Sequence, residues 1–529
     1  MRVGFILNNV GWTGGVNYYK NLLFALAKYP SENIEIVVFV GHSTKETEIY
    51  EKYATVIKDS FFDFYSDENI FGISCNESFY DESCYLQEIL KKHKINVLSH
   101  TSLVGLKGIK TIAWIPDFQH IHLPQFFTEK ELNDRNDTFA LQAQKSDGLI
   151  LSSYDALNDL RTFLNGKECM PVFVLPFVSQ PNERYFGLTK KDKKRLQDKY
   201  KLPDTFFYLP NQMWVHKNHI TVFKAIKTLK NKGIPVCVVC TGNMQDYRDE
   251  KHIQNILDFV SENNLDENIK LLGLIDYADV FALIKFSEAV INPSLFEGWS
   301  STVEECKGVG KPMILSDLSV HKEQYPNAVF FERENSGDLT GKLEKYLECS
   351  INSAPVFDIE QATKEFAKIY EKIVLEISNT KSPVVDFDTQ KDLLYSSCNY
   401  YNCPLRHSNK EAFKVLREIL QSKHLFVDKK ILLFGSGKFG EIVKEKIESS
   451  GLKVGFYVDN DKSRQEQIVN GIKVLSPEES LLISESVYII SIIDTNAAAV
   501  IYKQLKEMTV SEDNIFRGGG QMVCYASVE

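Results

Sequence analysis

Short apolar runs alternate with amphipathic stretches of helical period along most of the chain. This alternation predicts strand–helix units and mainly parallel sheets, which is the α/β fold class. A helix is expected at residues 17–27, after the first strand, and a long amphipathic helix at residues 359–377. The predicted strands fall into three groups: residues 3–8, 34–40, 97–100, 111–115, 148–152 and 172–176; residues 206–209, 236–241, 269–272, 289–292, 312–316 and 328–331; and residues 430–434, 453–458, 471–474 and 487–492.

Three groups of strands predict three domains in the 529 residues. Residues 378–392 lack a strong period and contain Ser382-Pro383, so they are interpreted as part of a linker. The expected segments are residues 1–180, residues 181–357, the long helix at 358–378, a linker at 379–428 with a short helix at 410–421, and residues 429–529.

The composition narrows the classes of partner. Hydrophobic residues make up 43% and charged residues 25%, as in an ordinary globular protein. The formal net charge of −10 argues against a nucleic-acid partner, which requires a clustered basic face. The densest basic run, Lys190-Lys-Asp-Lys-Lys-Arg195, is expected to be the solvated start of a helix. Weak peripheral contact with a membrane is the alternative for this run.

The first residues and the cysteines bear on the cellular compartment of the protein. Met1-Arg-Val-Gly-Phe-Ile-Leu7 is expected to be a strand rather than a signal peptide, since its apolar run is short and has no small-residue cleavage site. The ten cysteines are scattered, which favours a reducing cytoplasm, with attachment at the inner face of a membrane left open. Cys237 and Cys240 form a C-x-x-C match within a predicted strand. Their side chains are expected on opposite faces of that strand, in the core rather than on a metal.

The most informative stretch is Glu297-Gly-Trp-Ser-Ser-Thr-Val-Glu-Glu305, between a predicted strand and a helical pattern. The N–H groups at a helix start and the positive end of its dipole suit a phosphate. Glu297 and Glu305 can accept hydrogen bonds from hydroxyl groups on either side of that phosphate. A sugar on one side and a ribose on the other would make the ligand a nucleotide sugar.

This stretch resembles the E-G-F-G-L-P-x-x-E signature of family 4, the retaining glycosyltransferases of the GT-B fold. The resemblance implies that Glu297 contacts the donor sugar, that Glu305 contacts the ribose, and that the residues between them line the donor site, namely Gly298, Trp299, Ser300 and Ser301. Ser300, Ser301 and Thr302 replace Gly, Leu and Pro of the signature. Because serine and threonine cap helices well, the anion-binding geometry is expected to survive. Glu304 is expected on another face of the helix.

A second motif, Pro210-Asn-Gln-Met-Trp-Val-His-Lys-Asn-His219, follows the first predicted strand of the second domain. It is similar to the family's G-R-x-x-x-x-K-G element, in which Arg and Lys neutralise the donor diphosphate. Lys217 matches that lysine, whereas Gln212 stands at the arginine position. One of the two positive charges is therefore missing, and His216 or a lysine from elsewhere is the expected replacement.

Two stretches of the first domain are expected to face the same cleft. Gly14-Gly15 lies between the first strand and the first helix, where glycine lets the backbone approach an anionic ligand. Asp117 and His120 lie in Trp114-Ile-Pro-Asp-Phe-Gln-His120, at the carboxyl end of a predicted strand. The family resemblance implies that one of these two contacts the acceptor hydroxyl. Packing of His120 as a turn or core histidine is the alternative.

The resemblance covers residues 1–378 and implies two Rossmann-like domains that face a cleft. The acceptor would bind mainly to the first domain and the nucleotide sugar mainly to the second. Glu297, Lys217, His120 and Asp117 are the expected catalytic residues. Lys217 and helix N–H groups would stabilise the leaving diphosphate, and retention implies attack from the same face with a donor phosphate oxygen as base. No Asp-x-Asp motif lies near these elements, so the sequence requires neither a metal ion nor another cofactor.

The third domain is expected to be Rossmann-like and to bind a nucleotide. Ile431-Leu-Leu-Phe-Gly-Ser-Gly-Lys-Phe-Gly440 is a predicted strand followed by G-x-G-x-x-G, and Asp459 ends the next strand. This is the dinucleotide-binding pattern in its expected context, with Gly435, Gly437 and Gly440 at the pyrophosphate and Asp459 at the ribose. The segment resembles small sugar-nucleotide-binding domains of polysaccharide-synthesis proteins. A purely structural module is the alternative.

The leading hypothesis is a glycosyltransferase that moves a hexose to a glycan or lipid-linked acceptor in surface polysaccharide assembly. The Pro116-Asp-Phe-Gln-His120 segment is similar to mannosyltransferase-type members of the family, which favours GDP-mannose among the possible donors. An NAD-dependent oxidoreductase that uses the third domain, a non-catalytic sugar-nucleotide sensor and a GT-B epimerase are the alternatives. The sequence does not determine the oligomeric state.

Overall fold

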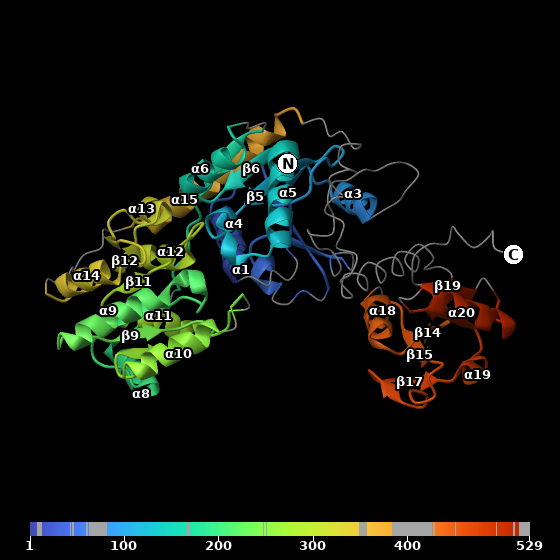
Figure 1. Ribbon diagram of the computed structural model, residues 1–529. Helices are drawn as coiled ribbons and strands as arrows, with labels where there is room; N and C mark the ends of the chain where they lie inside the picture. Colours follow the sequence, from blue (N-terminus) through green and yellow to red (C-terminus); the bar gives the residue numbers. More distant parts are fainter. Residues whose placement is uncertain are drawn as a thin grey trace.

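The computed structural model describes residues 1–7, 13–42, 44, 47–59, 62, 82–166, 170–182, 184–246, 248–249, 251–348, 357–382, 426, 429–449, 451–492, 495–511 and 514–517. Its described strands form three separate sheets, each within its own group of helices (Figure 1). The α/β fold class predicted from the hydrophobic pattern is confirmed.

The first domain is built on a seven-stranded parallel sheet of order β3-β2-β1-β4-β5-β6-β7. The order reverses between β1 and β4, and open α/β sheets bind ligands at the carboxyl ends of the strands beside such a switch point. The pattern missed β3, a short strand without a fully buried residue. The elements are β1 (Arg2–Ile6), α1 (Thr13–Lys28), β2 (Glu35–Val40), α2 (Glu48–Glu51), β3 (Thr55–Lys58), α3 (Glu82–Lys92), β4 (Val97–Ser99), β5 (Lys110–Ile115), α4 (Gln119–His122), η3 (Pro124–Phe126), α5 (Glu129–Lys145), β6 (Gly148–Leu151), α6 (Tyr154–Phe163) and β7 (Val172–Val174).

The second domain has a six-stranded parallel sheet of order β10-β9-β8-β11-β12-β13, with its switch point between β8 and β11. All six of its predicted strands are present. The elements are α7 (Arg184–Gly187), α8 (Lys190–Tyr200), β8 (Phe207–Leu209), η4 (Val215–Lys217), α9 (His219–Asn231), β9 (Val238–Cys240), α10 (His252–Glu262), β10 (Ile269–Leu271), α11 (Tyr277–Phe286), β11 (Val290–Asn292), α12 (Ser301–Gly308), β12 (Met313–Ser316), α13 (Ser319–Gln324), β13 (Val329–Phe331) and α14 (Ser336–Glu348).

Two local predictions for this domain are confirmed. The basic run opens α8, where the carboxylate of Asp192 accepts hydrogen bonds from the backbone N–H and the hydroxyl of Thr189, so the run is a solvated helix start. Cys237 and Cys240 are both buried and belong to hydrophobic clusters on opposite faces of the sheet. The two thiols therefore fill the core.

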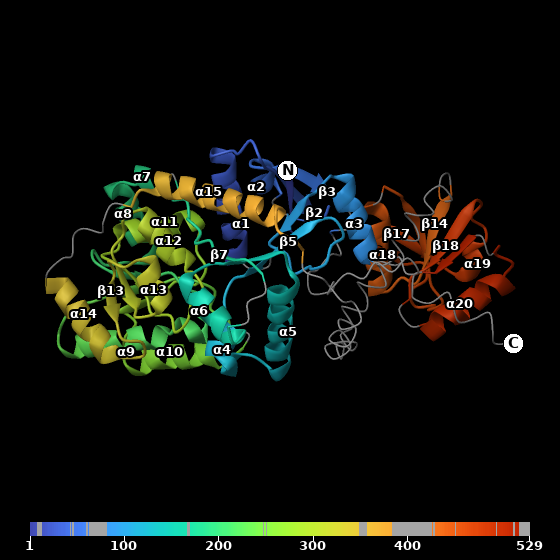
Figure 2. The same ribbon diagram turned by 90° about the horizontal axis from the view of Figure 1, so that it is seen from above.

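The helix α15 (Ile359–Ser378) leaves the second domain and packs on the first (Figure 2). Its buried side chains include Tyr370, Ile373 and Ile377, and they join the core cluster that contains Leu22 of α1. The fit against β6 is close, because a Cβ atom added to Gly148 would lie 2.3 Å from Cδ1 of Ile377. The two domains are thus connected by the chain at residues 174–184 and again by this helix.

The third domain has a six-stranded sheet of order β16-β17-β15-β14-β18-β19, parallel except for the β16–β17 pair. Most of the predicted linker at residues 379–428, including its short helix at residues 410–421, lies outside the described residues. The elements are β14 (Lys430–Phe434), α18 (Lys438–Ser449), β15 (Val454–Val458), β16 (Ile468–Val469), β17 (Ile472–Leu475), α19 (Pro477–Ser480), β18 (Ser486–Ile490), α20 (Thr495–Glu507) and β19 (Ile515–Arg517).

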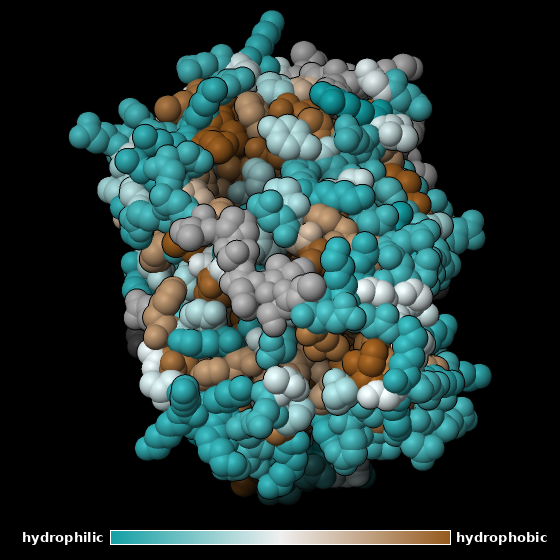
Figure 3. Space-filling model, turned by 90° about the vertical axis from the view of Figure 1, so that its left-hand side faces the viewer, coloured by the Kyte–Doolittle hydropathy of each residue, from teal (hydrophilic) through white to brown (hydrophobic). Residues whose placement is uncertain are grey.

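The described helices and the surface bear on membrane contact. Among the helices that the structure describes, none combines the length and the apolar character needed to cross a bilayer. Figure 3 shows one face of the molecule, on which hydrophilic side chains cover most of the surface and hydrophobic ones show as separate patches.

We predict that Ile373→Ala lowers the free energy of unfolding by about 2–4 kcal/mol, because it removes a core side chain that is 2% exposed. Ile369→Ala, on the outer face of the same helix and 41% exposed, should cost less than about 1 kcal/mol. Chemical denaturation followed by circular dichroism measures both values. Equal losses for the two variants would mean that α15 does not pack on the first domain as described.

Candidate active site

The strand order brings together two motifs that are distant in the sequence. Strands β8 and β11 are neighbours, so the loop after β8 lies beside the loop after β11. The loops are joined by hydrogen bonds from Asn211 Nδ2 to Asn292 Oδ1 (3.1 Å), from the Leu295 N–H to the carbonyl of His216 (2.8 Å), and from Asn218 Nδ2 to the carbonyl of Pro293 (3.2 Å). The predicted lysine and glutamate motifs therefore form one site at the switch point of the second sheet.

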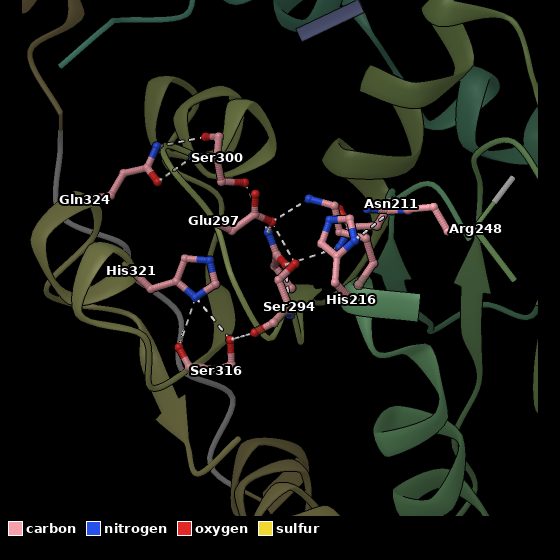
Figure 4. A network of polar contacts seen from close by, with 11 residues as sticks. Asn211, His216, Arg248, Ser294, Glu297, Ser300, Ser316, His321 and Gln324 are labelled. Atoms are coloured by element: carbon pink, nitrogen blue, oxygen red, sulfur yellow. Dashed lines mark hydrogen bonds and ion pairs between the residues drawn. The ribbon is translucent and has the colours of Figure 1, made fainter. Parts of the chain in front are cut away.

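An ion pair between Lys217 and Glu297 lies in this site. Figure 4 shows Glu297 with Ser294 and His216 beside it. Lys217 Nζ is 2.7 Å from Glu297 Oε1, and the side chains are only 15% and 10% exposed. Ser294 Oγ donates to the same oxygen at 2.7 Å. Burial alone would raise the pKa of Glu297, but the charge of Lys217 prevails and holds it at about 2. Glu297 is therefore a carboxylate at neutral pH, and both charges of the pair are in place.

The backbone N–H just before α12 already has a hydrogen-bond partner, so the start of this helix is less open to an anion than the sequence suggested. The N–H of Ser300 donates to Gln324 Oε1 (3.1 Å), and Gln324 Nε2 donates to the carbonyl of Ser300 (2.8 Å). Gln324 Nε2 also donates to Glu304 Oε1 (3.1 Å), and Glu304 is fully buried and paired with Lys307, so its carboxylate is engaged within the domain. Sequence reasoning missed Gln324 because it lies in α13, beyond the motif. Ser301 begins α12.

Glu305 lies in surroundings opposite to those of Glu297. Its side chain is buried, and the hydroxyl of Tyr277 lies 3.5 Å from its Oε1 atom. Burial raises the pKa of Glu305 to about 7, against a weaker opposing effect of Tyr277. The site thus contains one carboxyl group that is charged at neutral pH and one that titrates near neutral pH, because a lysine contacts the first and burial dominates at the second.

Gln212 and His216 do not supply the missing positive charge. Gln212 Oε1 accepts a hydrogen bond from the backbone N–H of Asn243 (2.7 Å), which gives this side chain a loop-bridging role. Burial lowers the pKa of His216 to about 3, so the ring is neutral at pH 7 and the expectation that it replaces the arginine is corrected. The ring instead contacts Arg248, whose Nη2 lies 3.1 Å from His216 Nδ1. The sequence motifs gave no signal for Arg248.

The glycines Gly14 and Gly15 lie inside α1, which begins at Thr13 rather than at residue 17. This corrects their expected place in a loop, and the preceding residues 8–12 lie outside the described part of the chain. Both glycines occupy the first turn of the helix, where N–H groups lack intrahelical partners.

Gly298 and Trp299 lie in the motif at residues 297–305, called the donor block below, and both contact the first domain. A Cβ atom added to Gly298 would lie 2.5 Å from the carbonyl oxygen of Pro116 and 2.7 Å from Cβ of Asp117. Trp299 Nε1 donates to the carbonyl of Phe177 (3.1 Å), and its ring packs on the first-domain core. Gly298 is therefore needed for the close approach of the two domains, and Trp299 lies at their junction.

The structure separates Asp117 from His120. Asp117 touches the donor block through Gly298 and accepts a hydrogen bond from the N–H of Gln119 (2.9 Å). His120 is 2% exposed, contacts Asn136 Oδ1 through Nε2 (3.2 Å) and packs on Phe139. His120 thus occupies the first-domain interior, which is the alternative that the sequence left open, and Asp117 is the member of the pair at the domain junction.

In the third domain, the glycine-rich turn follows β14 as predicted. Gly435 has φ of +114°, and a Cβ atom at Gly440 would lie 1.9 Å from the carbonyl oxygen of Gly435, so both positions exclude other residues. Gly437 lies close to Arg464. The carboxylate of Asp459 accepts hydrogen bonds from the backbone N–H (2.9 Å) and the hydroxyl (2.5 Å) of Ser436. Asp459 thus fastens the turn from within, and its predicted contact with a ribose stays a prediction.

The pKa of Glu305 generates a testable pH dependence. Because the folded protein holds the proton up to about pH 7 and an unfolded glutamic acid only to about 4.5, stability falls as pH rises between these values. Glu305→Gln removes this effect. The free energy of unfolding of the variant, relative to that of the wild type, should therefore increase by roughly 3 kcal/mol as the pH rises across that interval. Denaturation curves at pH 4.5 to 8 measure the difference, with Glu262→Gln on the exposed face of α10 as the control. A constant difference across this range would contradict the buried, weakly paired state of Glu305.

The comparisons with known proteins agree with this geometry. Residues 190–365 match the family model described as glycosyl transferases group 1, and residues 427–516 match one described as C2185-like, N-terminal. No curated protein matches the chain.

Solved structures also match. Alr3699/HepE from Anabaena in complex with UDP and glucose is 13% identical, with 72% of this chain and 100% of that chain covered and a TM-score of 0.51. A glycosyltransferase from Rickettsia africae ESF-5 is 14% identical, with 71% and 97% covered and a TM-score of 0.49. The first two domains of this chain have the GT-B fold, and residues 190–365 of the second are similar to the group 1 glycosyl transferases.

Proposed function

We propose that the protein is a retaining glycosyltransferase of family 4. It moves a hexose from a nucleoside-diphosphate sugar to a glycan or lipid-linked acceptor in surface polysaccharide assembly, on the cytoplasmic side of a membrane. The observation that supports this best is the buried Lys217–Glu297 pair at the switch point of the second sheet. GDP-mannose is the donor favoured by the sequence, and UDP-glucose is a second candidate because Alr3699/HepE is described in complex with UDP-glucose.

The second domain binds the donor. Glu297 accepts hydrogen bonds from the sugar hydroxyls, and Lys217, now paired with Glu297, turns its charge toward the diphosphate that leaves with its bonding electrons. The ionised form of Glu305 accepts hydrogen bonds from the ribose. The start of α12, with its positive dipole end, lies between these two carboxyl groups in the sequence.

The first domain binds the acceptor. Asp117 lies against Gly298 of the donor block, so an acceptor held by the loop after β5 would meet the donor sugar at the domain junction. Retention follows if the acceptor hydroxyl attacks from the face that the diphosphate leaves and a donor phosphate oxygen takes its proton. Closure of the domains around this point would exclude water and limit hydrolysis. This mechanism uses no metal ion.

A panel of nucleotides and nucleotide sugars tests the function. We expect one nucleoside diphosphate and its sugar to raise the melting temperature of the full chain by mass action, and that sugar to be consumed when acceptor is present. NMR of the glycoside product should show the anomeric configuration of the donor. An inverted product would remove the retaining assignment, and a protein that binds no member of the panel would remove the donor site.

Three variants divide the roles within the site. Lys217→Met should lower transfer about a hundredfold or more by removing a charge from the leaving group. Glu297→Gln should lower kcat more than donor affinity, and Glu305→Gln should weaken nucleotide affinity about tenfold. Lys224→Met, on the exposed face of α9, is the control for loss of a positive charge. Wild-type turnover in all three site variants would show that the site assignment is wrong.

A further inference from the structure

We propose that Arg248 supplies the second positive charge for the donor diphosphate, at the place left without one by Gln212. The inference rests on the proposed function and concerns the same site. It assigns an anion-binding role to a residue of the loop between β9 and α10, which lies outside the motifs of the donor site.

Two loops of the second domain are locked together to position this residue. A Cβ atom at Gly242 would lie 2.4 Å from the carbonyl oxygen of Asn211, so the loop after β9 packs directly on the loop after β8. The N–H of Met213 donates to the carbonyl of Asn243 (3.0 Å), and the N–H of Asn243 donates to Gln212 Oε1 (2.7 Å). Gln212 therefore joins the loop that carries Arg248 to the loop that carries Lys217.

Asp246 orients the guanidinium group. Its side chain is fully buried and accepts hydrogen bonds from the backbone N–H groups of Val215 (2.8 Å) and Arg248 (3.1 Å) and from Arg248 Nε (3.2 Å). Although burial raises the pKa of Asp246, these N–H groups bring it below its usual range, so the aspartate is charged. Because Asp246 holds the Nε edge of Arg248, the terminal nitrogen atoms are directed toward His216.

Two aromatic rings lie near the guanidinium group. Its central carbon lies 5.2 Å from the ring centre of Trp214 and 5.8 Å from that of Phe126. Trp214 belongs to the loop after β8, whereas Phe126 belongs to η3 of the first domain, so Arg248 lies where the two domains meet. A planar cation beside two rings, with 9% of its side chain exposed, has restricted freedom and would interact with an anion in little water.

The site then has two cations beside one neutral imidazole. Arg248 Nη2 lies 3.1 Å from His216 Nδ1, and Lys217 is the next residue in the chain, so both charges are close to that ring and add to the effect of burial in lowering its pKa. In Figure 4, Arg248 reaches His216 from the side opposite to Glu297. Each cation is held by a buried carboxylate, Glu297 for Lys217 and Asp246 for Arg248. A diphosphate carries more charge than one lysine can balance, and a second, planar cation can bind a phosphate through two N–H groups.

The test compares ligands that differ only in their phosphates. Titration calorimetry on the full chain measures binding of UDP, GDP, uridine and guanosine to the wild type, Arg248→Met and Arg248→Lys. We expect Arg248→Met to lower the affinity for UDP or GDP about 10- to 100-fold, the usual range for a lost charge-assisted hydrogen bond. The affinity for the matching nucleoside should stay within about twofold of the wild-type value. Arg248→Lys keeps the charge but loses the planar group with two parallel N–H donors, so its diphosphate affinity should lie between those of the wild type and Arg248→Met. Lys251→Met, an exposed lysine in the same loop, should bind as the wild type does.

A rescue experiment separates charge from packing. Arg248→Met combined with Gln212→Arg places the positive charge on the neighbouring loop and should restore part of the lost diphosphate affinity. If Arg248→Met does not fold, Arg248→Lys decides the question by the same ligand comparison.

Other outcomes overturn the inference. Unchanged diphosphate affinity in Arg248→Met, or an equal loss for diphosphate and nucleoside, removes Arg248 from the phosphates. A variant with unchanged donor affinity but a higher KM for the acceptor would place the arginine on the acceptor side. Failure of the wild type to bind any of these nucleotides or their sugars would instead refute the proposed function.

Discussion

The ion pair between Lys217 and Glu297 is the interaction on which the proposed donor site depends. Its two members come from loops after β8 and β11, which adjoin only because the second sheet reverses its strand order there. Because the pair is buried, loss of either residue would leave the other charge buried without a partner. In the proposed mechanism, a bound diphosphate attracts a lysine charge that Glu297 already holds in the site, and Ser294 supports that carboxylate.

Contacts between the first and second domains surround this pair. Gly298 lies against Asp117, Glu323 of α13 accepts hydrogen bonds from the N–H groups of Tyr154 and Asp155 at the start of α6, and α15 packs on the first-domain core. These contacts hold the donor block close to the loop after β5. The structure thus gives a physical reason for glycine at position 298, since any side chain there would separate the domains where transfer is proposed.

The aspartate of the third domain and the glutamates of the second have different partners. Asp459 accepts hydrogen bonds from the backbone N–H and the hydroxyl of Ser436, so it stabilises the glycine-rich turn. Glu297 is instead paired with a lysine, and Glu305 has a 3.5 Å contact with the hydroxyl of Tyr277. The proposed chemistry is assigned to the first two domains because a buried lysine and a charged carboxylate lie together there.

The sequence by itself located most of the strands and named the candidate residues of the proposed donor site. Apolar periodicity is local, so it located most strands, and the motifs identified Lys217, Glu297 and Glu305 before their loops were seen together. Only the tertiary structure decided which side chains meet. It buried His120, placed Gly14 and Gly15 within α1, made His216 neutral and brought Arg248 and Gln324 into the site. Strand order and burial decide these contacts, and neither is encoded in the spacing of a motif.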